Sequence, residues 1–249
     1  MSFIRVTDGN GSEVNMFYLY NQINSMVTRL GGRVEINCGD KINALAINID
    51  KSYIGYIRSQ IEEKIADIIS VNYKYKYFKE KILVKGLTPF QRELLLDALI
   101  CADYEEDKRY VALKMSRCRE YSINGTFNFR MTPLKNKWKE IVTFIPQFFT
   151  ESQLRDFIIY IVREKKNKKV YIENKSVYDN NFNKLQRVLL TNEDMSEGKI
   201  VREVILSCCG EIELNDKVSQ TDEKYLKEYF GDRIVFGKEF YKSIDKRNN

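Results

Sequence analysis

The chain has 249 residues, of which 43% are hydrophobic and 31% are charged, and its formal net charge is +6. This length and composition exclude global disorder and are compatible with one large domain or two small ones. Acidic and basic residues are interspersed, so the positive balance is typical of an ordinary soluble surface, with an anionic partner as the alternative.

No apolar run approaches the roughly 18 to 20 residues that a membrane-spanning helix needs, so no transmembrane segment is predicted. The first residues lack a basic region followed by an apolar one, and we expect them to form a strand and not a signal peptide. The five cysteines show no CxxC spacing, which favours free thiols in a reducing compartment. The sequence therefore predicts a cytoplasmic protein.

The first 50 residues have the pattern of a β-α-β-β segment. Residues 3–7 alternate weakly, a turn follows at Asp8-Gly9-Asn10-Gly11, and Ser12 is a suitable N-cap for a helix over residues 13–30. Gly31-Gly32 ends this helix. The runs 33–37 and 43–49 then fit a β-hairpin.

The middle of the chain reads as a series of helices. Asp50 caps a long helix whose isoleucines recur every three or four residues, and Thr88-Pro89 begins a second helix that extends to about residue 117. Asn124-Gly125 is expected to break the helical pattern, and Thr150 with Gln153 forms a capping box for a further helix. Between them, one helical face is marked by Trp138, Ile141, Val142, Ile145 and Phe149.

Strands and helices alternate again in the last part of the chain. We expect strands at 170–173, 203–207, 211–214 and 234–236, and helices at 193–201 and 222–230. The predicted fold class is thus helix-rich α+β, with a β-α-β-β start, central packed helices and a C-terminal αβ segment. The expected divisions are 1–86, 87–166 and 167–249, or one integrated domain.

The sequence lacks the residues of several common catalytic sites. It contains no histidine, which excludes histidine-dependent nucleophiles and metal ligands, and it has no glycine-rich phosphate loop. Cys208-Cys209 is expected to be buried at a strand end, and the acidic runs Glu105-Glu106-Asp107 and Glu193-Asp194 are expected to be solvated. No catalytic residue, metal or cofactor is predicted, although a hydrolase with two converging carboxylates stays open.

Two short segments combine residue types that bind nucleic acids. Residues 73–79 alternate tyrosines with lysines, which stack bases and neutralise phosphates, and residues 163–169 form a basic run. Both segments also end predicted helices, where lysines complement the helix dipole and need no partner. The candidate partner-binding residues are Tyr73, Lys74, Tyr75, Lys76, Arg163, Lys165, Lys166, Lys168 and Lys169.

The centre of the chain resembles a known family. Gly125, Phe127, Phe129 and Arg130 approximate a Gly-x-Phe-x-x-Phe-Arg-like segment, and an acidic-aromatic helix with Glu151, Phe157 and Ile158 follows. This order resembles the YtxC-type sporulation proteins of endospore-forming Firmicutes. The likeness continues through residues 193–195, 204–207, 211–214 and 230–236, and it covers roughly residues 50 to 236.

The resemblance implies a role in spore formation, with no established biochemical activity. From the residues themselves, we expect Phe127, Phe129 and Arg130 to form a core-anchoring loop whose arginine pairs with a carboxylate. The leading hypothesis is a cytoplasmic, sporulation-associated protein that acts through protein–protein contacts. The alternative is a nucleic-acid-binding protein that uses residues 73–79 and 163–169.

Overall fold

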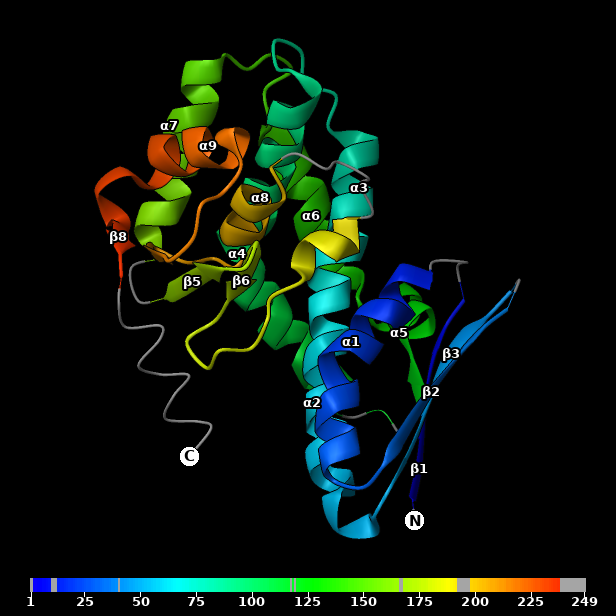
Figure 1. The fold of residues 1–249 in the computed structure, drawn as a ribbon. Helices are drawn as coiled ribbons and strands as arrows, with labels where there is room; N and C mark the ends of the chain where they lie inside the picture. The colour runs from blue at the N-terminus through cyan, green and yellow to red at the C-terminus, as the bar shows by residue number, and fades with distance from the viewer. Residues whose placement is uncertain are drawn as a thin grey trace. The chain divides into compact units, whose positions relative to one another are not determined.

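A computed structural model describes most of the chain, and Figure 1 shows its helices and strands. The described residues are 2–9, 13–39, 41–116, 118, 120–165, 168–191 and 198–237. Among them, no helix is both long and apolar enough to cross a membrane. The fold is helix-rich α+β, as predicted, with two small mixed sheets.

The chain folds into two compact units that differ from the three consecutive segments expected from the sequence. The first unit comprises Met1–Lys81, Asp103–Ile145 and Leu189–Asn192, and the second comprises Ile82–Ala102, Pro146–Val188 and Glu193–Asn249. Each unit is therefore assembled from separate stretches of chain, because packing and not sequence proximity decides which elements share a core.

The first unit contains the predicted β-α-β-β segment. Strand β1 (Ser2–Asp8) leads to α1 (Glu13–Arg29), and β2 (Arg33–Cys38) and β3 (Asn43–Ile49) form the hairpin. The strand order is β2-β3-β1-β4, with β1 antiparallel to β3 and parallel to β4 (Tyr121–Ser122). Ile4, Val6 and Leu45 are buried, and α1 lies on one side of the sheet (Figure 1). The expected cap, Ser12, lies outside the described residues.

The long helix after Asp50 has three consecutive parts. The Asp50 carboxylate accepts a hydrogen bond from the Ser52 backbone and caps a short 3-10 turn, η1 (Lys51–Tyr53). Helix α2 (Ile54–Ile68) follows and buries the predicted isoleucine stripe at Ile57, Ile61, Ile65 and Ile68. A π-helical turn, η2 (Ile69–Tyr73), then joins α2 to α3 (Lys74–Lys81), and the sequence pattern gave no sign of it.

Helix α4 (Pro89–Met115) begins as predicted. Thr88 and Gln91 exchange hydrogen bonds, in which the Gln91 backbone donates to Thr88 Oγ1 and the Thr88 backbone donates to Gln91 Oε1. The helix is interrupted at Asp103, which has non-helical backbone angles of φ −125° and ψ 17°. The boundary between the two units falls at this residue.

The region around Gly125 differs from the prediction. Residues Ile123–Arg130 form helix α5 and do not form a loop, because Ser122 caps the helix and accepts a hydrogen bond from the Gly125 backbone. Helix α6 (Thr132–Phe144) buries Leu134 and Trp138. The predicted face stops there, since Ile145 takes an extended conformation.

The second unit contains the C-terminal αβ segment. Thr150 and Gln153 form the predicted capping box of α7 (Glu151–Glu164). Strand order is β6-β5-β7-β8, in which β5 (Lys169–Glu173), β7 (Glu211–Leu214) and β8 (Ile234–Phe236) are parallel and β6 (Ser176–Tyr178) is antiparallel to β5. Helix α9 (Gln220–Phe230) connects β7 to β8 and is followed by a short 3-10 turn, η4 (Gly231–Arg233). Another 3-10 turn, η3 (Arg187–Thr191), spans the point at which the chain passes from the second unit to the first.

One predicted strand, 203–207, is wrong. Lys199–Leu206 form helix α8, which is buried at every position from Ile200 to Leu206. Its apolar residues Ile200, Val201, Val204 and Ile205 recur at helical spacing, but the short run of residues 204–206 taken alone reads like a strand. Cys208 and Cys209 are buried, as expected, but they follow a helix and not a strand. Residues 193–197 of the predicted preceding helix lie outside the described residues.

Buried ion pairs hold charged side chains inside both units. In the second unit, Arg202 Nε and Nη2 donate to the Asp97 carboxylate at 2.7 and 3.1 Å. In the first unit, Asp107 accepts from Lys74 Nζ at 2.8 Å, Trp138 Nε1 at 2.9 Å and Lys137 Nζ at 2.9 Å. The expectation that Asp107 is solvated is therefore wrong, because only 1% of its surface is exposed.

Replacing Lys74 with methionine tests the importance of this network. Lys74→Met should lower the free energy of unfolding by about 3 to 5 kcal/mol, because buried carboxylates lose their cation. The matched control is Lys79→Met on the exposed side of the same helix, which should change it by less than about 1 kcal/mol. Equilibrium urea unfolding measures both, and equal effects of the two substitutions would contradict the burial of the Lys74 ammonium.

Candidate binding face on the amino-terminal sheet

The first predicted nucleic-acid segment does not present its residues together at the surface. Lys74 and Tyr75 are buried, and the Lys74 ammonium pairs with Asp103 and Asp107. A side chain without accessible surface cannot contact a phosphate or a base, so the expectation for these two residues needs correction. Tyr73 is half-buried, and Lys76 is exposed.

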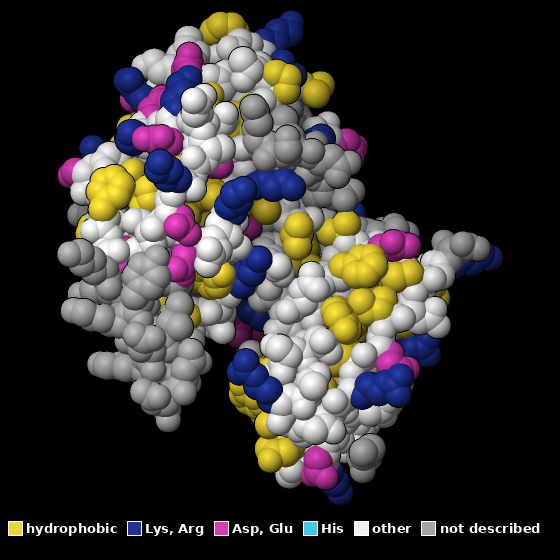
Figure 2. Space-filling view, viewed as in Figure 1, with side chains coloured by type: hydrophobic (Ala, Val, Ile, Leu, Met, Phe, Trp, Pro, Cys, Tyr) yellow, Lys and Arg dark blue, Asp and Glu magenta, His cyan; other side chains and the backbone are white. Residues whose placement is uncertain are grey.

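The second predicted segment is partly neutralised. Lys169 Nζ lies 2.9 Å from Glu213 and 3.4 Å from Glu211, and Lys165 Nζ donates to the Ala102 carbonyl at 3.1 Å. Arg163 and Lys168 are exposed, and Lys166 lies outside the described residues. The two predicted segments also belong to different units. Figure 2 shows basic and acidic side chains interspersed on the face in view.

The residues of the family-like motif have separate roles. Phe127 packs against Tyr73 and Trp138, with ring centroids 4.5 and 5.7 Å away. Phe129 is 86% exposed, and the Arg130 guanidinium donates to Cys118 Sγ and, among the described residues, to no carboxylate. Of the three residues expected to anchor the core, only Phe127 packs against other aromatic rings. Phe127 and Phe129 are two positions apart on a helix, so their side chains point in different directions.

The remaining motif residues lie at ordinary helical positions. A Cβ atom on Gly125 would lie 2.8 Å from Ser122 Oγ, so the small residue keeps the helix cap accessible. Glu151 is exposed in the first turn of α7, where a negative charge complements the helix dipole, and Phe157 is half-buried.

The amino-terminal sheet presents an open face that none of the sequence motifs had indicated. On β1, Phe3 and Arg5 are exposed and alternate with the buried Ile4 and Val6. The outward-facing residues of the neighbouring strands keep accessible surface; they are Ala44, Ala46 and Asn48 on β3, and Arg33, Glu35 and Asn37 on β2.

A pocket of about 400 Å³ lies beside this face. Phe3, Arg5 and Thr7 line it from β1, Arg58 lines it from α2, and Tyr121 lines it from β4. The Arg58 guanidinium lies 6.0 Å from the centroid of the Tyr121 ring. The Tyr121 hydroxyl donates to Glu62 Oε1 at 2.6 Å, and burial together with this carboxylate raises the pKa of the phenol.

The two arginines give the pocket its chemistry. Within the described part of the chain, neither Arg5 nor Arg58 forms an ion pair, so both guanidinium groups can receive an external anion. Glu120 is the acidic residue among the lining side chains. An aromatic ring beside two unpaired guanidinium groups suits a ligand that carries both phosphates and planar bases. The alternation of residues 3–7 could have indicated Phe3 and Arg5, but the approach of Arg58 depends on tertiary structure.

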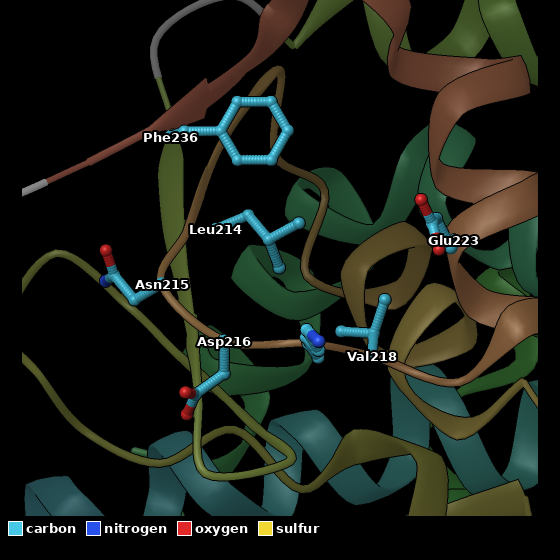
Figure 3. Close-up of a pocket in the computed structure, with 7 residues that line it drawn as sticks. Leu214, Asn215, Asp216, Val218, Glu223 and Phe236 are labelled. Atoms are coloured by element: carbon cyan, nitrogen blue, oxygen red, sulfur yellow. The ribbon is translucent and has the colours of Figure 1, made fainter.

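A larger pocket of about 600 Å³ lies in the second unit, at the C-terminal ends of the parallel strands β7 and β8. Ligands often bind at this edge of α/β sheets. Figure 3 shows Leu214, Val218 and Phe236 facing Glu223, whereas Asn215 and Asp216 point away. Glu223 already pairs with Lys227, so this lining does not define a ligand class.

The chain was also compared with known proteins. No protein-family model, curated protein or solved structure matches the chain. Within the described residues, no group of three or more acidic, cysteine or histidine side chains is arranged to hold a metal ion.

Two substitutions on α5 test the separate roles of its phenylalanines. Phe127→Ala should lower the free energy of unfolding by about 2 kcal/mol, because it removes the ring between Tyr73 and Trp138. Phe129→Ala removes the same atoms from an exposed position and should change it by less than about 0.5 kcal/mol. Thermal or urea unfolding distinguishes them, and a larger loss for Phe129→Ala would contradict the observed burial.

Proposed function

We propose that this chain is a cytoplasmic, sporulation-associated binding protein and that the open face of its amino-terminal sheet binds single-stranded nucleic acid. The resemblance of residues 50 to 236 to the YtxC-type family supports the biological setting. The cysteines carry free thiols, which suits a reducing compartment. The observation that carries the proposed activity is that Arg5 and Arg58, which form no ion pair within the described residues, line one pocket with the exposed ring of Phe3.

Single-stranded nucleic acid fits this face better than a duplex does. A duplex hides the faces of its bases, whereas a single strand can place a base on Phe3, which is 58% exposed. The flanking arginines would then contact phosphates on the same strand. The surface differs from the predicted segments, because Lys74 and Tyr75 are enclosed in the core.

Salt dependence of binding separates phosphate contacts from base stacking. Binding of a labelled single-stranded oligonucleotide should weaken with salt, and Arg5→Gln or Arg58→Gln should each reduce the slope of log K against log salt by about 0.7. Phe3→Ala should weaken binding by about 1 to 3 kcal/mol at each salt concentration without changing the slope, because it removes stacking.

Arg29→Gln is the matched control, because it removes an equal charge from the exposed end of α1, outside the pocket. It should leave the slope unchanged. Undetectable or salt-insensitive binding of the wild-type protein to single-stranded DNA and RNA would refute the proposal. If Arg29→Gln reduced the slope as much as Arg5→Gln does, the salt dependence would reflect the net charge of the protein and not phosphate contacts at the pocket.

A protein partner is the second candidate, and a separate observation favours it. In the second unit, Leu83 and Phe148 are 79% and 59% exposed, and Phe148 forms a parallel β-bridge with Lys85, two residues after Leu83. A Cβ atom on Gly86 would lie 2.4 Å from the Phe149 carbonyl oxygen, so the backbone at this place admits only glycine. Apolar side chains held at the surface in this way suit a protein contact.

Sporulation assays test the setting and the second candidate together. Deleting the gene should reduce the number of heat-resistant spores, and the wild-type gene should restore it. If the Leu83 and Phe148 contact is required, Leu83→Ser with Phe148→Ser should fail to restore it, whereas Tyr160→Ser, at an exposed position on α7, should succeed. Normal spore yield in the deletion strain would contradict a role in sporulation.

A further inference from the structure

A second, smaller pocket lies inside the first unit, separate from the sheet face. Its volume is about 220 Å³, below the roughly 300 to 1,000 Å³ of a typical drug-sized site. It is lined from five elements, namely the end of β1, the start of α1, the π-helical turn η2, helix α3 and helix α5. The residues that carry the argument are Asp8, Asn15, Tyr73, Lys76, Glu80 and Phe127.

The inner wall of the pocket is a fixed hydrogen-bonded group. Asn15 Nδ2 donates to Asp8 Oδ2 at 2.7 Å, and the Tyr73 hydroxyl donates to Asp8 Oδ1 at 3.0 Å. Only 1% of the surface of Asp8 and of Asn15 is exposed. Burial and the nearby Asp8 carboxylate raise the pKa of Tyr73, so the phenol stays protonated and keeps donating.

The same group leaves an acceptor without a donor. Because Nδ2 is used by Asp8, the orientation of the Asn15 amide is defined, and Asn15 Oδ1 is buried without a hydrogen-bond partner in the described protein. An unpaired buried acceptor destabilises the folded protein, because it has lost its hydrogen bonds to water without gaining a donor. A donor supplied by a bound molecule would remove this destabilisation.

A lysine adds a positive charge to the lining of the pocket. Lys76 is exposed and has no ion pair within the described residues. Burial of part of its side chain lowers the pKa of the Lys76 ammonium, and the Asp8 carboxylate opposes this shift. Glu80 also lines the pocket, and its carboxylate lies 2.7 Å from the Lys81 ammonium, which offsets its charge.

We propose that this pocket binds a small zwitterionic amino acid. Its ammonium group would donate to Asn15 Oδ1 and to the Asp8 carboxylate, and its carboxylate would pair with Lys76. Phe127 would contact the carbon atoms between the two charges. The π-helical turn that ends at Tyr73 is consistent with such a site, because π-turns are frequent at functional positions.

Binding of matched small molecules to the full chain tests the charge pattern. Calorimetric titration with glycine, alanine, serine and leucine should show saturable binding of at least one of them. Analogues that lack one charge, methylamine and ethylamine or acetate and propionate, should bind at least about tenfold more weakly, because each loses a charge-assisted hydrogen bond.

The Lys76→Met substitution tests whether the pocket binds an amino acid through Lys76 or holds only water. The variant changes an exposed residue and should fold, but its affinity for the amino acid should fall at least about tenfold, to that of the corresponding amine. Lys79→Met, on the same helix and outside the pocket, should bind like the wild type. Lack of saturable binding by all four amino acids up to about 10 mM, equal binding of the single-charge analogues, or an unchanged Lys76→Met variant would overturn the proposal.

Discussion

The packing of the helices in the first unit depends on the hydrogen bonds that the buried Asp107 carboxylate accepts. This carboxylate accepts hydrogen bonds from side chains of α3 and α6, so one acidic residue of α4 joins three helices. Burying this charge is favourable only with such partners. Because Lys74 points toward Asp107, Tyr75 and Phe78 are buried with it, and Lys76 and Lys79 are left at the surface. Trp138 in turn packs against Phe127, which lines the pocket that we propose binds an amino acid.

Strand β1 supplies residues to both proposed sites. Its side chains alternate, so Ile4, Val6 and Asp8 point inward whereas Phe3 and Arg5 point outward. The inward-pointing row ends at Asp8, whose carboxylate lines the smaller pocket of the first unit, and the outward-pointing row forms part of the open face. The two proposals therefore share a strand but use opposite sides of it, and each can fail without the other.

Much of the fold could be predicted because its signals are local. Thr88 with Gln91 and Thr150 with Gln153 satisfy backbone groups of their own helices, so the helix starts are encoded within four residues. The isoleucine stripe of α2 and the hairpin of β2 and β3 are equally local. Helix α8 was misread because the short apolar run near its end, residues 204–206, does not by itself distinguish a helix from a strand.

The candidate sites were less predictable, since they depend on partners distant in sequence. The sequence by itself determined a helix-rich α+β chain without histidine, and the bounds of most of its helices and strands. Only the tertiary structure decided that Lys74 is enclosed, that Arg58 approaches Phe3 and Arg5, and that Asn15 retains an unpaired acceptor. Local backbone hydrogen bonding sets the elements, whereas charge burial and side-chain contact are set by which elements pack together.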